Sequence, residues 1–394
     1  MRPLLAALVL AFCAQAASAD FVEDFSGKSL ATDPQGHRGW MTLTGSGEAT
    51  MTFKQEGHHG VVEIDATKDR RNIWWAVIKR AVSPSLDRSL LGRSDKALQV
   101  ETKIRLSEAP RRVNLSLNHT RTTDFHSNLA EFDIPDTGWH VISFTAKSFD
   151  AKPDDEVFAQ MALMDGGRQR HRIEIAYFKV SVVDAASAPP DLGNPMPYRP
   201  ALPEHFSNAV PVAQDAIIDS AWPDVNFRDW TELSPDEGTL GVKVLSVSGT
   251  QITILRFDLS AFKGKTADGW GILELTTSSA GWAPTNLEEF GYLRTVEIKS
   301  AAPDFERNTV TWNSLFQGKP VLDVLNGQLI YDVQPALQRA GKTRIAINPA
   351  VMQRLIDGTT KGLAIYTQGA VNATFASSEA PGREHRPTVY FNVK

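Results

Sequence analysis

The chain has 394 residues, of which 42% are hydrophobic, and a formal net charge of −5 at pH 7. This length is sufficient for two or three domains that each bury a core. The modest negative charge, with no basic tail, argues against nucleic acid as a partner.

Residues 1–19 have the features of a secretory signal peptide. A basic residue, Arg2, precedes a short uncharged apolar run, and a small-x-small cleavage site follows at residues 17–19. The run is shorter than the roughly 20 apolar residues of a transmembrane anchor. The one cysteine, Cys13, falls inside this segment. We therefore expect a mature protein that starts at Asp20, is secreted or periplasmic, contains no disulfide and does not insert into a membrane.

Residues 20–184 read as short strands with apolar residues at every second position. In the run from Val113 to His119, the odd positions are expected to point to a core, so Asn114, Ser116 and Asn118 line the opposite face. The other predicted strands here are residues 73–78, 98–106, 139–145 and 173–183. Alternation of this kind, with turn residues between the runs, predicts a β-sandwich.

Residues 185–204 are rich in proline, with Ala, Ser and Gly between the prolines. Such a stretch is extended and semi-rigid, and it cannot enter the interior of a sheet. We interpret it as a linker to a second domain, residues 205–394.

The second domain also reads as strands, with short helices predicted at residues 333–340 and 349–357. Pro349 suits the first turn of the latter. The predicted strands are residues 242–247, 250–259, 271–277, 293–299, 343–347, 362–367 and 388–393. The predicted fold class is therefore all-β, with two jelly-roll-like β-sandwich domains joined by a proline-rich linker.

Sequence landmarks in the second domain resemble the DNRLRE domain, which overlaps carbohydrate-binding module family 96. The landmarks are residues 215–219, 223–226, 255–260, 308–313, 375–379 and 386–391, in this order. This resemblance implies a β-sandwich of a secreted or surface protein that binds acidic polysaccharide. Residues 240–243 depart from the Leu-x-Val-Gly stretch of that family. The alternation at residues 255–259 is also what a half-buried scaffold strand requires.

The first domain resembles, at the level of pattern, the carbohydrate-binding modules with a galactose-binding-like jelly roll. Residues 73–78, 113–118, 138–144 and 177–181 match strands of that group. The resemblance implies a sugar-binding surface on this domain.

The densest polar cluster of the first domain is residues 118–128. It offers Asn118, His119, Arg121 and His126 beside the aromatic ring of Phe125. Directional hydrogen-bonding groups next to an apolar ring suit a sugar site, and arginine can grip a carboxylate or sulfate. The structural alternative is a polar hairpin turn.

A second cluster places basic residues beside paired tryptophans at residues 68–80. Arg71, Trp74 and Lys79 are candidates to bind an anionic sugar chain, together with Asn114. Neighbours on a strand point to opposite sides, so one of Trp74 and Trp75 is expected to face the core. The alternative is a packed tryptophan in each layer with an exposed basic rim.

Enzymatic function is the second hypothesis, and a uronic-acid lyase is its clearest form. Such a lyase needs a group that neutralises the carboxylate, a base for the C5 proton and an acid for the leaving oxygen. Asn118, Arg121, His126 and Tyr177 could supply these groups if they meet in the fold. Glu131 and Asp133, which share a strand face, are candidates for the carboxylate pair of glycoside hydrolysis; the structural alternative is a solvated strand edge.

No cofactor is expected, apart from a Ca²⁺ ion that Asp219, Asp224 and Asn226 could help to bind through oxygen atoms. The preferred hypothesis is a secreted protein that binds a polysaccharide. The clusters of basic and aromatic residues favour an acidic polysaccharide. The alternatives are the lyase and a structural protein of a surface matrix without a sugar site.

Overall fold

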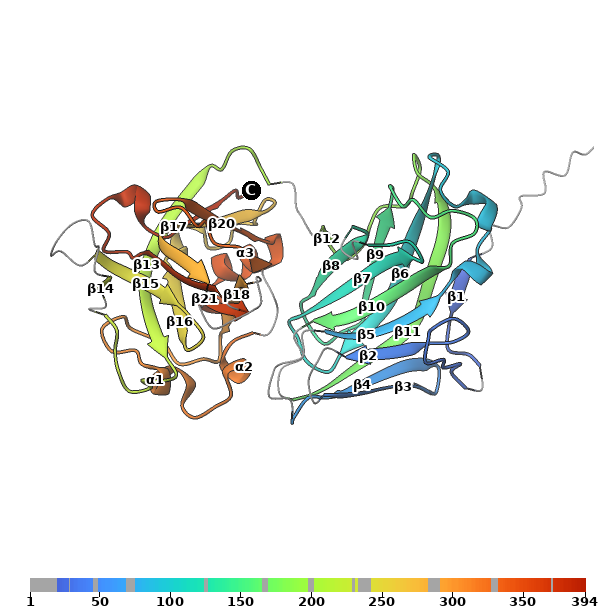
Figure 1. Ribbon diagram of the computed structural model, residues 1–394, viewed down its shortest axis with the longest axis horizontal. Coiled ribbons are helices and arrows are strands. Elements are labelled where there is room, and N and C mark those ends of the chain that lie inside the picture. The colour runs from blue at the N-terminus through green and yellow to red at the C-terminus, as the bar shows by residue number, and fades with distance from the viewer. Residues whose placement is uncertain are drawn as a thin grey trace, which may run out of the picture.

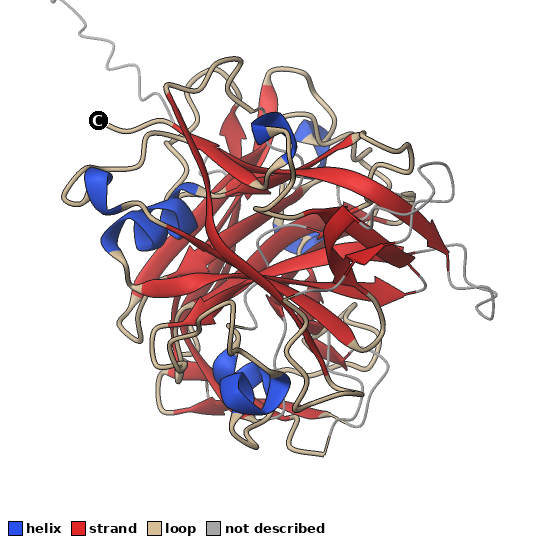
Figure 2. Ribbon diagram, turned by 90° about the vertical axis from the view of Figure 1, so that its left-hand side faces the viewer, coloured by secondary structure: helices blue, strands red, loops and turns tan. Residues whose placement is uncertain are grey.

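The structure is a computed structural model that describes residues 20–27, 29–44, 49–68, 75–123, 127–164, 169–197, 202–228, 231–232, 242–282, 291–326, 332–369 and 371–394. The predicted signal peptide lies outside the described residues. Two lobes stand side by side (Figure 1), and strands make up most of the structure (Figure 2). The prediction of an all-β fold is confirmed.

The N-terminal lobe consists of two six-stranded antiparallel sheets. The first, here called the β11 sheet, contains β1 (Phe21–Glu23), β3 (Thr50–Glu56), β4 (His59–Asp65), β6 (Lys96–Leu106), β9 (His140–Ala146) and β11 (Arg170–Asp184). The second, the β7 sheet, has the order β12-β8-β7-β10-β5-β2 and contains β2 (Met41–Thr44), β5 (Trp75–Ala81), β7 (Arg111–His119), β8 (Leu129–Ile134), β10 (Val157–Met164) and β12 (Met196–Pro197).

One hydrophobic core lies between these two sheets, because both contribute every second residue to it. Trp40 stands at its centre, 1% exposed, and the rings of Phe21, Phe53 and Phe178 meet it edge-on at centroid distances of 6.3, 5.5 and 5.3 Å. The outward faces of the two sheets therefore point in opposite directions.

The described residues 185–197 of the proline-rich segment pack along the N-terminal lobe. The amide of Ser143 in β9 donates to the carbonyl oxygen of Leu192 at 3.1 Å, and the amide of Leu192 donates to Ser143 Oγ at 3.0 Å. Further along, Met196 and Pro197 pair with β8 and add an edge strand to the β7 sheet. An edge position is compatible with a proline, which has no amide to donate.

The C-terminal lobe contains one eleven-stranded antiparallel sheet, in which ten strands follow a continuous path and one branches from it. They are β13 (Asn208–Asp219), β14 (Thr231–Glu232), β15 (Val242–Val247), β16 (Gln251–Phe257), β17 (Gly271–Trp282), β18 (Gly291–Lys299), β19 (Asp332–Val333), β20 (Lys342–Ile347), β21 (Thr360–Gly369), β22 (Val371–Ala376) and β23 (Thr388–Phe391). The short helices α1 (Trp312–Phe316) and α2 (Val321–Val324) contribute to a second core beside the main one.

The predicted helix at 349–357 is present as α3 (Pro349–Asp357). The side chain of Asn348 caps it by accepting a hydrogen bond from the amide of Val351 at 2.9 Å, and Gly358 ends it with a φ of 70°. None of the helices in the described part of the chain is long and apolar enough to cross a membrane.

The predicted helix at 333–340 is wrong. Val333 pairs with Leu293 of β18 as part of β19, and the chain then runs without helix to a turn in which Ala340 has a φ of 62°. Pro335 disfavours a helical conformation at the residue before it, and pairing with β18 supplies the backbone bonds that a helix would have made.

Candidate functional site

The outward face of the β7 sheet presents the polar residues of β7. Val113 and Leu117 belong to the core, so Asn114, Ser116 and Asn118 project to the other side of the sheet. The sequence alternation predicted this orientation, and the strand register now identifies the neighbours of these residues.

One row of half-buried side chains crosses this face from β8 to β2. Ser116 lies opposite Leu129 on one side and Gln160 on the other, Gln160 lies opposite Lys79, and Lys79 lies opposite Met41. We call these five residues the open row. Five strands at about 4.8 Å spacing give the open row a length of about 19 Å.

The rows on both sides of the open row are more deeply buried. On one side Asn118 is 2% exposed and Phe158 7%. On the other side Asn114 is 5% exposed and Val77 8%. The open row is therefore an accessible track across the sheet with largely buried flanks.

The polar groups of this face have unused hydrogen-bonding capacity. In the described part of the chain, the side chains of Ser116, Gln160 and Lys79 have no hydrogen-bond or ion-pair partner. Asn114 Oδ1 and Asn118 Nδ2 are buried without a partner. Because these two atoms have almost no exposed surface, the half-buried polar groups of the open row are the ones that a polar ligand could contact.

Lys79 supplies the positive charge of the open row. Its ammonium group lies 4.2 Å from the ring centroid of Phe158. Burial lowers the pKa of Lys79, and the charge of Glu156 opposes this shift. The carboxylate of Glu156 is engaged by His37 Nδ1 at 2.7 Å, so the ammonium group remains available to an anion.

The outward face of the β11 sheet is different because its charges pair with one another. Arg172 binds Glu56 at 2.6 Å, Glu63 at 3.2 Å and Glu174 at 3.1 Å. Arg105 also binds Glu174. This contrast between a face whose charges pair with one another and the open row, whose polar groups have no partner among the described residues, selects the β7 sheet as the candidate site.

Of the residues considered for a lyase, Asn118 and Tyr177 lie on different sheets, and His126 lies outside the described residues. Asn118 projects from the β7 sheet, whereas Tyr177 lies on β11 of the other sheet and donates to Glu101 at 2.8 Å. Burial, together with Glu101, raises the pKa of Tyr177 to about 12, which does not suit a catalytic acid at neutral pH. Sequence spacing could not show that the two strands belong to different sheets.

Two residues expected at the sugar site instead stabilise the turn after β7. His119 is 7% exposed and its Nε2 lies 2.6 Å from Asp150 Oδ1. Arg121 binds Asp155 through Nε and Nη2 at 3.0 and 2.8 Å and donates to the Asp150 carbonyl oxygen at 2.7 Å. Their polar atoms have partners within the lobe, and their role at a sugar or catalytic site stays a prediction.

The remaining predicted site residues divide into two groups. Lys79, Asn114 and Asn118 lie together on the outward face of the β7 sheet. The other predicted residues, Arg71, Trp74, Phe125 and His126, lie outside the described residues. Sequence reasoning missed Gln160 as a member of this face, although it is the one polar residue in the apolar run of β10.

The paired carboxylates of β8 are neutralised by arginines. Glu131 Oε2 accepts from Arg112 Nη1 at 3.0 Å, and Asp133 Oδ2 accepts from Arg354 Nη1 at 2.6 Å. The two carboxylates share a face, as the sequence predicts, but their ion pairs do not suit a general acid and base.

The turn after β13 offers no arranged metal site. Asp219 accepts from the amide of Ala221, Asp224 accepts from Asn313, and the amide of Asn226 donates to backbone carbonyls. Among the described residues, no three His, Cys, Asp or Glu side chains are grouped to hold a metal ion. Calcium binding at this turn stays a prediction.

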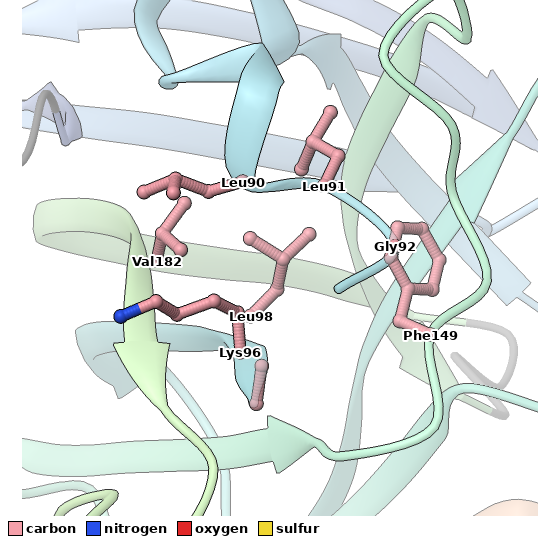
Figure 3. A pocket seen from close by; sticks show the side chains of 8 residues that line it. Leu90, Leu91, Gly92, Lys96, Leu98, Phe149 and Val182 are labelled. Carbon is pink, nitrogen blue, oxygen red and sulfur yellow. The ribbon is translucent and has the colours of Figure 1, made fainter. Parts of the chain in front are cut away.

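A small hollow at the start of β6 in the N-terminal lobe is lined mostly by apolar side chains (Figure 3). Leu90, Leu98, Phe149 and Val182 line it, and the ammonium group of its one charged residue, Lys96, pairs with Asp184. It has no converging polar groups and does not compete with the open row as a sugar site.

Comparison with known proteins shows low similarity. No family model and no curated protein matches the chain, so the DNRLRE resemblance stays a prediction. Three similar solved structures are a CBM4 structure, a family 11 carbohydrate-binding module from Clostridium thermocellum in complex with a β-1,3-1,4-mixed-linked tetrasaccharide, and the N-terminal CBM22-1-CBM22-2 tandem domain of Paenibacillus barcinonensis Xyn10C.

The first of these is 14% identical with a TM-score of 0.29, and covers 41% of this chain and 97% of its own. The second is 12% identical with a TM-score of 0.28, over 42% of this chain and 97% of its own. The third is 12% identical with a TM-score of 0.28, over 97% of this chain and 99% of its own. At these scores no residue role is carried over, and the site rests on the geometry of the open row.

His171 provides a test of the electrostatics near the start of β7. Burial, together with the charge of Arg111, lowers the pKa of His171 from 6.5 to about 4. The unfolded chain therefore binds a proton between pH 6.5 and pH 4 that the folded protein does not, so stability falls as the pH falls through this window. We expect acidification from pH 7 to pH 4 to cost about 3 kcal/mol more in the wild type than in His171→Gln.

Urea unfolding at several pH values measures this difference. His58→Gln, at an exposed position, should keep the wild-type pH dependence. Equal pH dependence of the wild type and His171→Gln would contradict the prediction.

Proposed function

We propose that the chain is a secreted carbohydrate-binding protein that binds an acidic polysaccharide on the outward face of the β7 sheet. The observation that carries this proposal is the open row, in which Ser116, Gln160 and Lys79 lie in register without partners. Hydroxyl and amide groups suit sugar hydroxyls, and a free ammonium group suits a carboxylate or sulfate.

The shape of the open row supports a polymer as the ligand. It crosses five strands, and its length of about 19 Å exceeds that of one sugar ring, so several units of a chain can lie along it. Its apolar ends, Leu129 and Met41, offer surface to the non-polar faces of sugar rings. Secretion follows from the signal-peptide features of residues 1–19, which bring the protein to extracellular polymers.

Affinity electrophoresis and calorimetry with acidic and neutral polysaccharides test the proposal. We expect Lys79→Ala to weaken binding of the acidic polymer about tenfold, because a hydrogen bond to a charged group contributes about 1.5–3 kcal/mol. Gln160→Ala should weaken binding about threefold irrespective of polymer charge, since it removes a neutral hydrogen bond. The affinity for the acidic polymer should also fall with salt.

Lys103→Ala is the matched control, because Lys103 projects from the opposite face of the lobe. It should bind as the wild type does. The proposal is overturned if the wild type binds no polymer, or if Lys79→Ala and Lys103→Ala behave alike. A rise in ultraviolet absorbance from unsaturated uronic ends during incubation would assign the lyase activity instead.

A further inference from the structure

The two lobes meet through charged side chains at one end of the outward face of the β7 sheet. Arg354 of α3 in the C-terminal lobe reaches Asp133 of β8 in the N-terminal lobe, and Nη1 and Oδ2 are 2.6 Å apart. Both side chains are largely buried, at 18% and 5% exposure. Figure 1 shows α3 on the side of its lobe that faces the N-terminal lobe.

Arg354 is held rigidly within its own lobe. Its Nε and Nη2 bind both carboxylate oxygens of Glu297, at 2.9 and 2.7 Å, and Glu297 is 2% exposed. Asn326 donates to the same carboxylate at 3.2 Å. This two-pronged bond fixes the plane of the guanidinium group and aims Nη1 at Asp133.

A second charged contact lies beside the first. Lys299 of β18 is 3.5 Å from Glu108, which Arg111 of β7 binds at 2.9 Å. Domains in one chain move relative to one another by default unless their interface is strong. Two ion pairs join these two lobes, and the pairing of β12 with β8 keeps the connecting segment against the N-terminal lobe.

The junction lies next to the open row. Asp133 is opposite Arg112, and Arg112 is four residues from Ser116 along β7, which is about 13 Å. Between them lies Asn114, whose Oδ1 is buried without a partner. The C-terminal lobe thus stands along the side of the polar face where β7 begins.

We infer that the C-terminal lobe stays docked beside the outward face of the β7 sheet and forms one side of the ligand-binding surface. Arg354 is the positioning residue that holds the lobe there. This inference rests on the proposed function for its ligand, an acidic polysaccharide. The polymer is bound with full affinity only when the lobes are docked, because the docked lobe completes one side of the face.

Asp133→Asn in the full chain separates this inference from a simple charge effect. The substitution keeps the shape of the side chain and removes the ion pair to Arg354. Arg354 stays bound to Glu297, so the guanidinium group keeps its carboxylate partner within its own lobe. Electrostatics alone predicts equal or tighter binding of an acidic polymer, because a negative charge is lost. The inference predicts binding about tenfold weaker, because the C-terminal lobe is released.

Small-angle X-ray scattering of the Asp133→Asn protein, without any ligand, measures whether the two lobes stay docked. The radius of gyration should increase in Asp133→Asn, and further in Asp133→Asn with Lys299→Met, which removes the second contact. Asp184→Asn is the control, since Asp184 pairs with Lys96 inside the N-terminal lobe. It should change neither the radius of gyration nor the affinity.

The outcomes are distinct. An unchanged radius of gyration in the double variant overturns the docking role of these ion pairs. A larger radius with unchanged or tighter binding overturns the role of the C-terminal lobe in binding. A wild type that binds no polysaccharide defeats the proposed function, while the scattering comparison still decides whether Arg354 and Asp133 dock the lobes.

Discussion

Trp40→Ala is expected to destabilise the N-terminal lobe by about 3–5 kcal/mol, the usual cost of truncating a large buried aromatic residue. Trp40 is 1% exposed and packs edge-on against Phe21, Phe53 and Phe178, which come from β1, β3 and β11. Because interiors are close-packed, the neighbouring rings cannot fill the space that the indole leaves. A loss of this size is a large fraction of the 5–15 kcal/mol that stabilises a typical domain.

Denaturant unfolding followed by circular dichroism measures this loss. Trp222→Ala is the matched control, because Trp222 is 64% exposed. It should change stability by no more than about 0.5 kcal/mol. The prediction fails if the two variants unfold at the same denaturant concentration.

Local patterns in the sequence were sufficient for the orientation of side chains within a strand. The alternation in β7 correctly placed Asn114, Ser116 and Asn118 on one face, because neighbouring side chains of a strand point to opposite sides. The same logic accounts for α3, where a capping residue, Pro349 and Gly358 mark both ends.

The partners of each strand could not be predicted from the sequence, because pairing joins residues far apart in the chain. Gln160 and Lys79 become neighbours only through the pairing of β10 with β5, which are about 80 residues apart in sequence. Tyr177 was placed in the lyase hypothesis with Asn118 for the same reason, although its strand belongs to the other sheet. The open row exists because of the register between paired strands, and a pattern within one strand does not contain that register.

Ion pairs also lie beyond local patterns. Glu131 and Asp133 were correctly expected on one face, but their partners come from β7 and from α3, which is more than 200 residues further along the chain. His119 and Arg121 belong to a polar cluster in the sequence. Only the fold shows that their side chains pair with Asp150 and Asp155.

Arg112→Met is expected to destabilise the N-terminal lobe by about 3–5 kcal/mol, because it leaves a buried carboxylate without its partner. Arg112 is fully buried and Glu131 is 8% exposed, with 3.0 Å between Nη1 and Oε2. Arg170→Met is the control, since its pair with Asp65 lies at the surface with Arg170 78% exposed, and it should cost at most about 1 kcal/mol.

The double variant Arg112→Met with Glu131→Leu decides whether the charge itself or the packing is responsible. Removing both charges takes away the desolvation cost, so the double variant should regain most of the stability that Arg112→Met loses. Glu131→Leu alone should cost less than Arg112→Met, because the guanidinium group keeps Asp133 as its cross-strand neighbour. A double-mutant cycle by denaturant unfolding measures the coupling, and additive losses would show that the pair contributes through packing instead of charge.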